Sequence, residues 1–309
     1  MARLLRERRF VHGLSRHRGD RLSPIRERVG HCVALQRKPT YSPQQHLTND
    51  AAIMDAVALS LEQRGWRLTR CTEAFLETQP VPPADLYLNM CQGAAASEQL
   101  VSLERAGAML VNTPSSVLAC HRHRLVCKLS DSGVPFPRTL IVPTWLNGED
   151  ALALSQFVGM HQSVWIKRGD VHAETSEDVV LARADHVFAA LARFAARGIT
   201  RVAVQEHVRG PILKFYGVAD HRFFRFYDAK LGPAGPTPVV DEARLRTLAF
   251  TAAEVLGLQV FGGDVALPLP DQPVLIDLND WPSFAPYRGE AALAIADFVH
   301  RQAQHGVAA

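Results

Sequence analysis

The sequence has few cysteines, few aromatic residues and no long apolar run. Its 309 residues include 5 cysteines, and aromatic residues make up 7%. The cysteines are odd in number and form no Cys-x-x-Cys pair, so they predict reduced thiols rather than a disulfide framework or a zinc site. No apolar run approaches the roughly 20 residues of a membrane-spanning helix, and no apolar signal segment opens the chain. We therefore expect a cytoplasmic protein without a membrane partner.

Charge is unevenly distributed along the chain, whose formal net charge is +3. Nine arginines but only three acidic residues precede Gly30, and the remainder holds 25 basic and 28 acidic residues. The basic character therefore belongs to an Arg-rich leader over residues 1–29, which we predict to be disordered. A basic tail of this kind is able to bind nucleic acid. An unstructured leader, or a start codon placed too far upstream, is the simpler interpretation, so we expect no nucleic-acid partner.

The rest of the chain predicts an α/β fold. Hydrophobic residues make up 47% and charged residues 21%, and the length is suited to two or three subdomains. From His31 onward, short apolar runs alternate with helical patterns, which is typical of βαβ units around a parallel sheet. The strands expected in this first unit are residues 32–35, 66–71, 85–91 and 108–111, and the expected helices are 48–64 and 97–106.

The pattern after residue 112 changes to mixed α+β units. Thr113 and Pro114 are typical of a helix start and Gly133 of a helix end, so we predict one helix over residues 113–132. The other expected strands are 139–142, 163–168, 179–182, 201–207, 212–218 and 222–227, followed by a hairpin over 259–279; the other expected helices are 185–197, 241–256 and one from about 289. We divide the chain into an N-terminal substrate domain (30–112), a central region (113–208) and a C-terminal subdomain (209–309).

The predicted hairpin carries two carboxylates. A symmetric pairing about its proline-rich turn sets Asp264 directly across from Asp277. Like charges that face each other across a ladder are destabilising, whereas Mg²⁺ prefers oxygen ligands from one or two carboxylates together with substrate phosphates. The alternation of a strand puts Asn279 on the face of Asp277 and points Ile276 and Leu278 to the core. The hairpin therefore predicts a Mg²⁺ site.

A solvated polar face on a surface hairpin is an equally simple interpretation of the two carboxylates taken alone. Gly262 and Gly263 precede the first of them. Glycine weakens a strand unless a backbone or a ligand has to approach closely. The glycine pair therefore favours the metal site over the solvated face.

These residues resemble the C-terminal motifs of the ATP-grasp superfamily, in which a strand carboxylate is followed by an acidic-x-Asn pair and a proline-containing loop. The motifs read Gly263-Asp264-Val265 and Asp277-Leu278-Asn279, with Pro282 in the loop. Other segments are similar to superfamily motifs in the same order: 112–116 and 133–139 lead into the ATP-grasp unit, 164–167 is similar to the phosphate-binding strand, and 204–208 to the adenine hinge. The resemblance covers about residues 31–305. It implies ATP-grasp architecture, with an N-terminal parallel-sheet domain followed by two α+β subdomains that sandwich ATP.

The resemblance also implies a role for each matched residue. Basic side chains suit phosphate oxygens, and those expected at or beside the nucleotide are Arg122, Lys167 and Lys214. The hinge residues expected at adenine are Gln205, Glu206 and Val208. The residues expected to hold Mg²⁺ are Asp264, Asp277 and Asn279, and the catalytic candidates at the transferred phosphate are Arg225 and Lys230. A solvated surface position is the alternative for Lys167 or Arg122 taken alone.

Three features depart from the superfamily pattern. The loop that follows the phosphate-binding strand, residues 168–176, has only one glycine where the superfamily has a Gly-rich loop. Asp277 stands where most ligases of the superfamily have glutamate. Ile212 stands two residues before Lys214, where ligases often have an acidic residue. The last two departures bear on the reaction rather than on the nucleotide.

The leading functional hypothesis is an ATP-dependent ligase. ATP would phosphorylate a substrate carboxylate, and an amine would then attack the acylphosphate, with Mg²⁺ and basic residues neutralising charge. One alternative is a small-molecule kinase, since Asp-x-Asn also resembles the inositol polyphosphate kinases of the superfamily. A nucleotide-binding protein without turnover is the third. A homodimer is compatible with each of these.

The sequence does not name the substrates. A polyol phosphate would need a basic pocket, for which Arg37, Lys38 and Arg288 are candidates. We expect the loops over residues 36–47, 90–96 and 283–288 to select the substrates, because loops carry specificity on a rigid scaffold.

Overall fold

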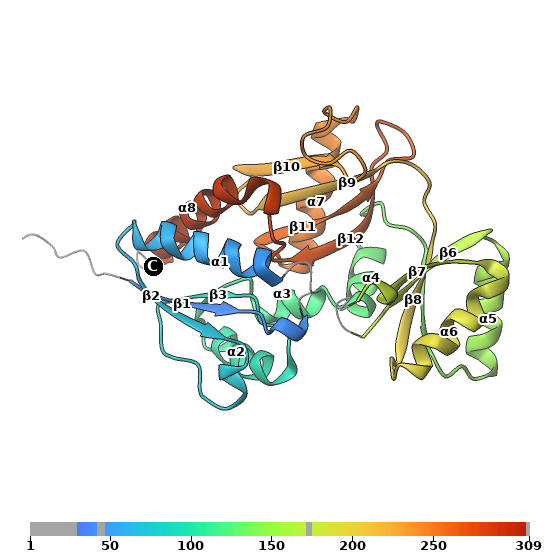
Figure 1. Cartoon of the computed structure of the whole chain (residues 1–309), viewed down its shortest axis with the longest axis horizontal. Coiled ribbons are helices and arrows are strands. Elements are labelled where there is room, and N and C mark those ends of the chain that lie inside the picture. Colours follow the sequence, from blue (N-terminus) through green and yellow to red (C-terminus); the bar gives the residue numbers. More distant parts are fainter. Residues whose placement is uncertain (1–29, 42–46, 171–174, 307–309) are drawn as a thin grey trace, which may run out of the picture.

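The structure, a computed structural model, describes residues 30–41, 47–170 and 175–306. The Arg-rich leader over residues 1–29 lies outside this part, so its predicted disorder stays a prediction. The described part contains three sheets of four strands each, arranged side by side along the long axis of the molecule (Figure 1). No helix among the described residues is long and apolar enough to cross a membrane.

The first sheet is parallel and confirms the predicted βαβ units. Its strands lie in the order β2-β1-β3-β4. Successive side chains of β1 point to opposite faces: Cys32 and Ala34 pack toward α1, whereas Val33 and Leu35 pack toward α2. The elements of this sheet are β1 (His31–Gln36), α1 (Leu47–Glu62), β2 (Arg67–Thr72), β3 (Leu86–Asn89), α2 (Ala94–Arg105) and β4 (Met109–Val111).

The second sheet is antiparallel, with the order β5-β8-β6-β7. Helices α5 and α6 cover one face, where Val164 and Ile166 of β6 join the core. Our reading of the sequence names no helix at α5, although Asn147 caps it by accepting from the backbone N–H of Asp150. The elements are β5 (Thr139–Pro143), α5 (Gly148–Gly159), β6 (Ser163–Arg168), β7 (Val179–Arg183), α6 (Val187–Ala196) and β8 (Arg201–Glu206).

The third sheet is also antiparallel, with the order β10-β9-β11-β12. Helix α7 covers one face, where Leu213, Phe215 and Leu278 are buried. Asp241 caps the start of α7, and Gly257 ends it in the left-handed conformation that glycine adopts without strain. The elements are β9 (Ile212–Val218), β10 (Phe223–Asp228), α7 (Glu242–Leu256), β11 (Val260–Ala266) and β12 (Val274–Asp280).

The prediction of one continuous helix over residues 113–132 is wrong. Two helices, α3 (Pro114–Ala119) and α4 (Arg122–Ser130), replace it. The break is at His121, whose φ of −58° and ψ of 127° are not helical. The break redirects the chain so that α4 packs against α7, with Leu125 and Leu129 in the shared core. It also brings the buried side chain of Arg122 to the third sheet.

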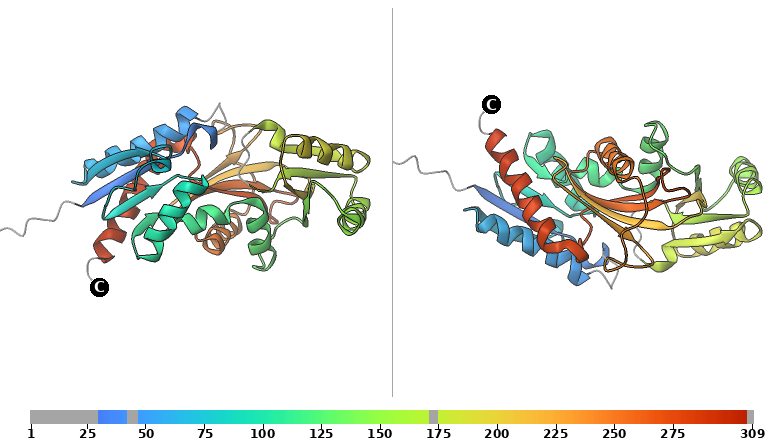
Figure 2. Two further views of the ribbon diagram at one scale, coloured as in Figure 1. Left: turned by 90° about the horizontal axis from the view of Figure 1, so that it is seen from below. Right: turned by 90° about the horizontal axis from the view of Figure 1, so that it is seen from above.

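The last helix, α8 (Arg288–Gly306), returns to the N-terminal sheet. It lies alongside α1, and its Ile295 and Val299 share a core with Cys32 and Ile53. Figure 2 shows α1 (blue) and α8 (red) from below and from above. The remaining short elements are 3-10 turns at Pro39–Tyr41, Phe75–Glu77, Ser176–Asp178, Ala184–His186 and Ala285–Tyr287.

Asn112 connects the N-terminal sheet to the third sheet. Its side chain is fully buried, and its Nδ2 donates to the Val260 carbonyl at 2.7 Å. Its Oδ1 accepts from the backbone N–H groups of Gln259 at 2.7 Å and Val260 at 2.9 Å. Trp281 adds a bond from its Nε1 to the Val111 carbonyl at 3.1 Å. The two sheets are therefore held in one fixed relation by polar contacts at the start of β11.

Replacing Asn112 by alanine should therefore destabilise the protein. Because the backbone N–H groups of Gln259 and Val260 lose their acceptor and the Val260 carbonyl keeps only the Trp281 N–H as donor, we expect the free energy of unfolding to fall by about 3 kcal/mol. Urea denaturation measures the change, with Asn147→Ala, which removes only the cap of α5, as the matched control. A loss no larger than that of the control would contradict the proposed role of Asn112.

Candidate functional site

The predicted facing carboxylates are present on the third sheet. Asp264 of β11 pairs with Asp277 of β12 on one side and with Lys214 of β9 on the other. Tyr227 of β10 is opposite Lys214, so one row of side chains crosses all four strands. Because α7 covers the other face, this row faces away from the core. The prediction that Asp264 lies across from Asp277 is confirmed.

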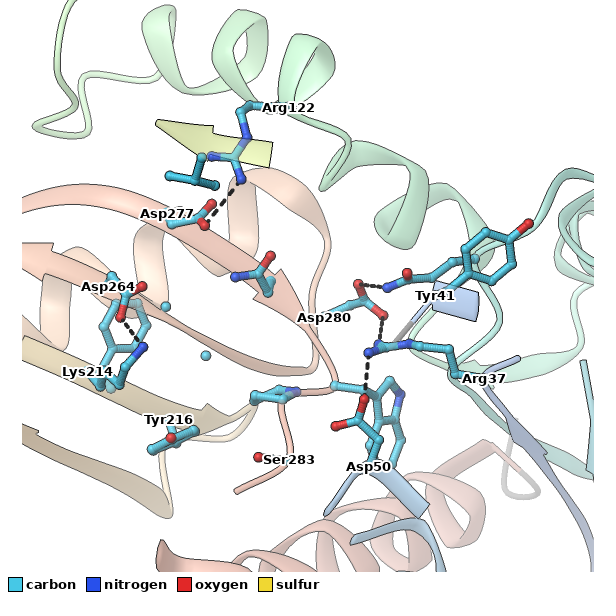
Figure 3. Close-up of a pocket in the computed structure, with 18 residues that line it drawn as sticks. Arg37, Tyr41, Asp50, Arg122, Lys214, Tyr216, Asp264, Asp277, Asp280 and Ser283 are labelled. Atoms are coloured by element: carbon cyan, nitrogen blue, oxygen red, sulfur yellow. Dashed lines mark hydrogen bonds and ion pairs between the residues drawn. The ribbon is translucent and has the colours of Figure 1, made fainter. Parts of the chain in front are cut away.

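The row borders a cavity of about 290 Å³. Residues from β9, β11 and β12, from the start of α4, and from the loops of the N-terminal sheet line it. Figure 3 shows two groups of ion pairs, one at Asp264 and Asp277 and the other around Arg37. The described lining residues are Arg37, Tyr41, Asp50, Gln92, Arg122, Val179, Lys214, Phe215, Tyr216, Gly262, Gly263, Asp264, Asp277, Asn279, Asp280, Trp281, Pro282 and Ser283.

Basic side chains compensate the repulsion between the two facing carboxylates. Lys214 Nζ lies 2.9 Å from Asp264 Oδ1, and an Arg122 terminal nitrogen lies 3.4 Å from Asp277 Oδ2. Burial lowers the pKa of Lys214, but the attraction and hydrogen bond of Asp264 outweigh it and raise that pKa above its usual value. Each carboxylate thus has a cation of its own, which makes the pair tolerable in a partly buried cavity.

A third cation, Lys167, reaches this place from the second sheet. Its side chain is 5% exposed, and its Nζ donates to the Ile276 carbonyl of β12 at 3.0 Å. Burial, followed by repulsion from Arg122, lowers the pKa of Lys167 to about 8, against the opposing attraction of Asp277 and Asp264. Lys167 is therefore not a solvated strand-end lysine. It is a desolvated amine whose charged form would gain from a nearby anion.

Asp264, Asp277 and Asn279 can supply part of a cation site. They offer two carboxylates and one amide oxygen, and all three line the cavity. Among the described residues no group of three or more His, Cys, Asp or Glu side chains is placed to hold a metal ion. A hard cation that draws its remaining ligands from phosphate oxygens and water matches this partial set, as Mg²⁺ does. The donor chemistry therefore fits Mg²⁺ bound together with a phosphate ligand.

Between Asp264 and the turn, the pairing of the hairpin differs from the predicted symmetric register. The register shifts between Asp264 and Val265, so Leu275 instead of Ile276 is buried with Leu278. Ile276 is half-buried and is absent from the described core around α7. This irregularity is a β-bulge, which reverses the side-chain alternation on one strand. The prediction that Ile276 points to the core is therefore wrong.

The glycine pair has a packing reason. A Cβ on Gly263 would lie 2.7 Å from the Phe215 ring and would also clash with the Asp277 carbonyl. A Cβ on Gly262 would lie 2.8 Å from the Pro282 ring and 2.9 Å from the Phe215 carbonyl. Protein atoms, rather than a ligand, therefore require these glycines, and the pair is no independent sign of a metal site.

Comparison with known proteins decides the fold. No protein-family model and no curated protein matches the chain. Solved structures do match, among them D-alanyl-alanine synthetase A from Vibrio cholerae, with a TM-score of 0.66 at 12% identity over 90% of this chain and 98% of that chain. The RimK domain ATP-grasp protein from Sphaerobacter thermophilus matches with a TM-score of 0.61 at 22% identity, over 86% of this chain and 98% of that chain. D-cycloserine synthetase DcsG matches with a TM-score of 0.60 at 18% identity, over 87% and 100%.

The chain has the ATP-grasp fold. The fold class expected from the sequence, an N-terminal parallel sheet followed by two α+β units, is confirmed. Because the sequence identities are low, these matches establish the fold alone. The roles of the individual site residues have to come from the geometry of this chain.

The residues expected at the adenine hinge, Gln205, Glu206 and Val208, lie on β8 of the second sheet and directly after it, and their role stays a prediction. Gln205 is buried and donates from Nε2 to Thr139 Oγ1 at 3.2 Å. The backbone N–H of Glu206 donates to the Arg138 carbonyl at 2.9 Å, so this N–H already has a partner. Glu206 and Val208 are half-buried. None of the three hinge residues is among the described residues that line the cavity at the carboxylates.

Arg225 and Lys230 lie apart from the carboxylates. Arg225 shares the sheet face of Tyr216, but its terminal nitrogen lies 2.7 Å from Glu290 Oε2 and its guanidinium lies over the Phe223 ring. Lys230 is exposed in the turn that follows β10. Neither is among the described residues that line the cavity. Their assignment to the transferred phosphate therefore stays a prediction. The cations that pair with or interact with the two carboxylates are Lys214, Arg122 and Lys167.

Arg37 is the one member of the suggested basic pocket that lines the cavity. Lys38 instead pairs with Glu77 at 2.7 Å, and Arg288 donates to Asn49 Oδ1 at 2.6 Å. Arg37 itself lies between two carboxylates, with 3.2 Å to Asp50 and 3.4 Å to Asp280.

Our reading of the sequence assigned no role to Asp50 or Asp280, and it included Gln92 only as part of the loop over residues 90–96 that we expected to select the substrates; all three line the cavity. Asp280 directly follows the predicted metal ligand Asn279, and Gln92 follows the predicted third strand. Polar residues at the carboxyl ends of parallel strands are typical of ligand sites in α/β sheets. That position was the available signal for Gln92.

Glu73 organises the two loops that carry Arg37 and Gln92. It is 1% exposed, and its carboxylate accepts from the backbone N–H of Lys38 at 2.9 Å and from that of Gln92 at 2.8 Å. The backbone N–H of Gly93 donates to it as well. One buried carboxylate thus ties together the carboxyl ends of β1 and β3, where the cavity begins.

Replacing Glu73 by glutamine should loosen both loops. A glutamine offers one acceptor oxygen and turns an amide toward backbone N–H groups, so we expect a loss of about 2 kcal/mol in the free energy of unfolding. Urea denaturation measures this loss. Glu77→Gln, a neighbouring exposed position, is the matched control and should leave stability unchanged. Equal stability of the two variants would show that Glu73 does not hold the loops.

Proposed function

We propose that this protein is an ATP-dependent ligase that activates a substrate carboxylate as an acylphosphate for attack by an amine, with Mg²⁺. The observation that carries the proposal is the row of Asp277, Asp264 and Lys214, with Arg122 and Lys167 beside it. Two carboxylates with three cations next to them match a site that takes a metal ion and phosphate oxygens together. The named activities of the structural neighbours, which are synthetases and ligases, agree with this reaction class.

The nucleotide would lie between the second and third sheets. Lys167 extends from the second sheet and touches the third, so it is suited to bind a phosphate at their junction. Arg122 contributes a second positive charge from α4. Mg²⁺, held by Asp264, Asp277 and Asn279, would neutralise phosphate oxygens. Lys214 would then exchange part of its attraction to Asp264 for attraction to the phosphate.

The reaction requires no covalent nucleophile from the protein. A substrate carboxylate oxygen attacks the γ-phosphorus and displaces ADP, and an amine then attacks the acyl carbon and displaces inorganic phosphate. Arg122 and Lys167 stabilise negative charge on the phosphoryl group during the first step. The protein's task is to align the reactants and to exclude water, which would hydrolyse the acylphosphate.

A polyol phosphate kinase is the less favoured alternative. Its substrate would bring several negative charges and would need several free cations in the cavity. Of the three suggested basic residues, Arg37 lines the cavity, and Asp50 and Asp280 already pair with it. Lys38 and Arg288 have other partners. Because each of the three suggested basic residues already has a partner, the geometry favours the ligase over the kinase.

The fate of the γ-phosphate tests the proposal. With labelled ATP, a carboxylate and an amine, we expect the label in inorganic phosphate, in equal amount to the amide product. Label retained in a stable phosphorylated product would support the kinase. Nucleotide binding without ADP formation under any substrate mixture would support a non-catalytic role.

Asp277→Asn should abolish Mg²⁺-dependent turnover while leaving the fold intact. The substitution keeps the size of the side chain but removes a charged metal ligand, so we expect ADP formation to fall by at least about a hundredfold. Asp271→Asn, in the exposed turn of the same hairpin, is the matched control. Wild-type turnover in the Asp277 variant would reject the metal assignment.

ATP binding should be accompanied by proton uptake at Lys167. Since the pKa of Lys167 is lowered to about 8, part of the amine is neutral at alkaline pH, and a phosphate would raise that pKa. Uptake should therefore increase from about 0.1 proton at pH 7 to about 0.9 at pH 9. Calorimetry in buffers of different ionisation enthalpy measures it. Lys167→Met should show no such increase, and an increase that persists in this variant would contradict the assignment.

A further inference from the structure

Two of the cations at the proposed phosphate site come from different parts of the fold. Arg122 is the first residue of α4, whereas Lys167 belongs to β6 of the second sheet. Burial, and then repulsion from Arg122, lowers the pKa of Lys167, so the two positive charges interact with each other. Because like charges repel, the elements that carry them need other contacts to hold them together.

The contacts of Arg122 itself are incomplete. Its Nε is buried and donates to no described residue, while one of its terminal nitrogens lies 3.4 Å from Asp277 Oδ2. A buried donor that is left without an acceptor costs stability, and a phosphate oxygen would supply that acceptor. The guanidinium is therefore suited to an anion, and its position depends on the helix that carries it.

The first turn of α4 is held by a carbonyl of the second sheet. The N–H groups at the start of an α-helix have no partner within the helix, and the N-cap residue, His121, makes no side-chain capping bond. The backbone N–H of His123 donates instead to the Gly169 carbonyl at 3.1 Å. The ring Nδ1 of His123 lies 2.8 Å from the same oxygen and has to be the donor, because a carbonyl only accepts.

Gly169 is in turn fixed on β8. Its backbone N–H donates to the Arg201 carbonyl at 2.9 Å, which extends the pairing of β6 with β8 by one residue. A Cβ on Gly169 would lie 3.0 Å from the Arg201 carbonyl oxygen, so only a glycine packs here without displacing its neighbour. The carbonyl that accepts from His123 therefore belongs to a peptide that is fixed in the second sheet. Figure 1 shows α4 beside the strands of this sheet.

We propose that His123 is a positioning residue for the nucleotide: its bond to the Gly169 carbonyl holds Arg122 and Lys167 together at the phosphates. The inference rests on the proposed function. Arg122 directly precedes His123, and Lys167 lies two residues before Gly169, so each cation is next to one partner of this bond. His123 is not among the described residues that line the cavity, and it acts through the two cations.

A pair of isosteric substitutions at His123 tests the inference. Asparagine and leucine have the same shape, but only asparagine can donate to the Gly169 carbonyl. Calorimetry measures the Kd for a non-hydrolysable ATP analogue in the presence of Mg²⁺. We expect this Kd to rise about tenfold in His123→Leu and to stay within about twofold of the wild-type value in His123→Asn. His186→Leu and His186→Asn, at an exposed position, are the matched controls.

The same pair separates positioning from a general effect on stability. Leucine favours a helix more than asparagine does, so helix propensity alone makes His123→Leu the more stable of the two variants. Positioning predicts that the more stable variant binds the nucleotide more weakly. Equal Kd values in the two variants, or Kd values that follow their melting temperatures, would overturn the inference and leave the proposed function standing. A wild-type protein that does not bind the analogue would contradict both.

A double-mutant cycle with Lys167→Met tests whether His123 acts through the two cations. Once one cation is removed, there is no pair of charges left to align. In the Lys167→Met background we therefore expect His123→Leu to change Kd by less than about threefold. The full tenfold effect in that background would overturn the inference.

A variant that does not fold also decides the matter. If His123→Leu is unfolded, His123→Ala replaces it in both comparisons, with the same expected results. If both are unfolded while His123→Asn folds, the bond to Gly169 is required for the fold itself, and the inference is overturned.

Discussion

The electrostatic repulsion between Asp264 and Asp277, which face each other on neighbouring strands, is the constraint on which the rest of this site depends. Two carboxylates facing each other across a ladder are unfavourable unless positive charge lies close by. The fold supplies that charge from three separate elements: Lys214 from the neighbouring strand, Arg122 from α4 and Lys167 from the second sheet. Lys214 pairs with Asp264 and Arg122 with Asp277, while Lys167 adds positive charge from the second sheet. The arrangement of the subdomains is thus coupled to the electrostatics of one strand pair.

The break between α3 and α4 contributes to the same compensation of charge at the two carboxylates. A continuous helix over residues 113–132 would not have turned at His121, where the backbone leaves the helical region. Because the chain turns there, α4 packs on α7 and Arg122 reaches Asp277. In this chain, the non-helical backbone at His121 therefore places the buried cation Arg122 beside the carboxylates.

The sequence predicted the strands well, because they depend on short-range patterns. Strands β6 and β9 have the bounds expected from their apolar runs. The prediction that Asp264 faces Asp277 is correct, but the symmetric register from which it was derived is absent next to the turn, where Val265 pairs with Leu275. A bulge, which the pattern within either strand does not specify, brings the two carboxylates opposite each other and turns Ile276 out of the core.

The sequence patterns did not predict the contacts between residues that are far apart in the chain. No local pattern indicates that Lys167 touches the Ile276 carbonyl, or that α8 packs on α1. The same holds for the hydrogen bond between Gln92 and Asp280, which are 188 residues apart in the sequence. The resemblance to ATP-grasp proteins supplied candidates for nucleotide binding and for the transferred phosphate, but it did not choose between Arg225 and Lys230 and did not name the residues that select the substrate.

The central claim is that Asp264, Asp277 and Asn279 hold a metal ion together with the nucleotide phosphates. Diffraction at the manganese absorption edge, from crystals grown with Mn²⁺ and a non-hydrolysable ATP analogue, tests it most directly. The account predicts an anomalous peak within coordination distance of the Asp264 and Asp277 carboxylates, with phosphate oxygens completing the ligand set. A bound nucleotide whose metal ion lies elsewhere, with Asp264 and Asp277 still paired only to Lys214 and Arg122, would contradict it.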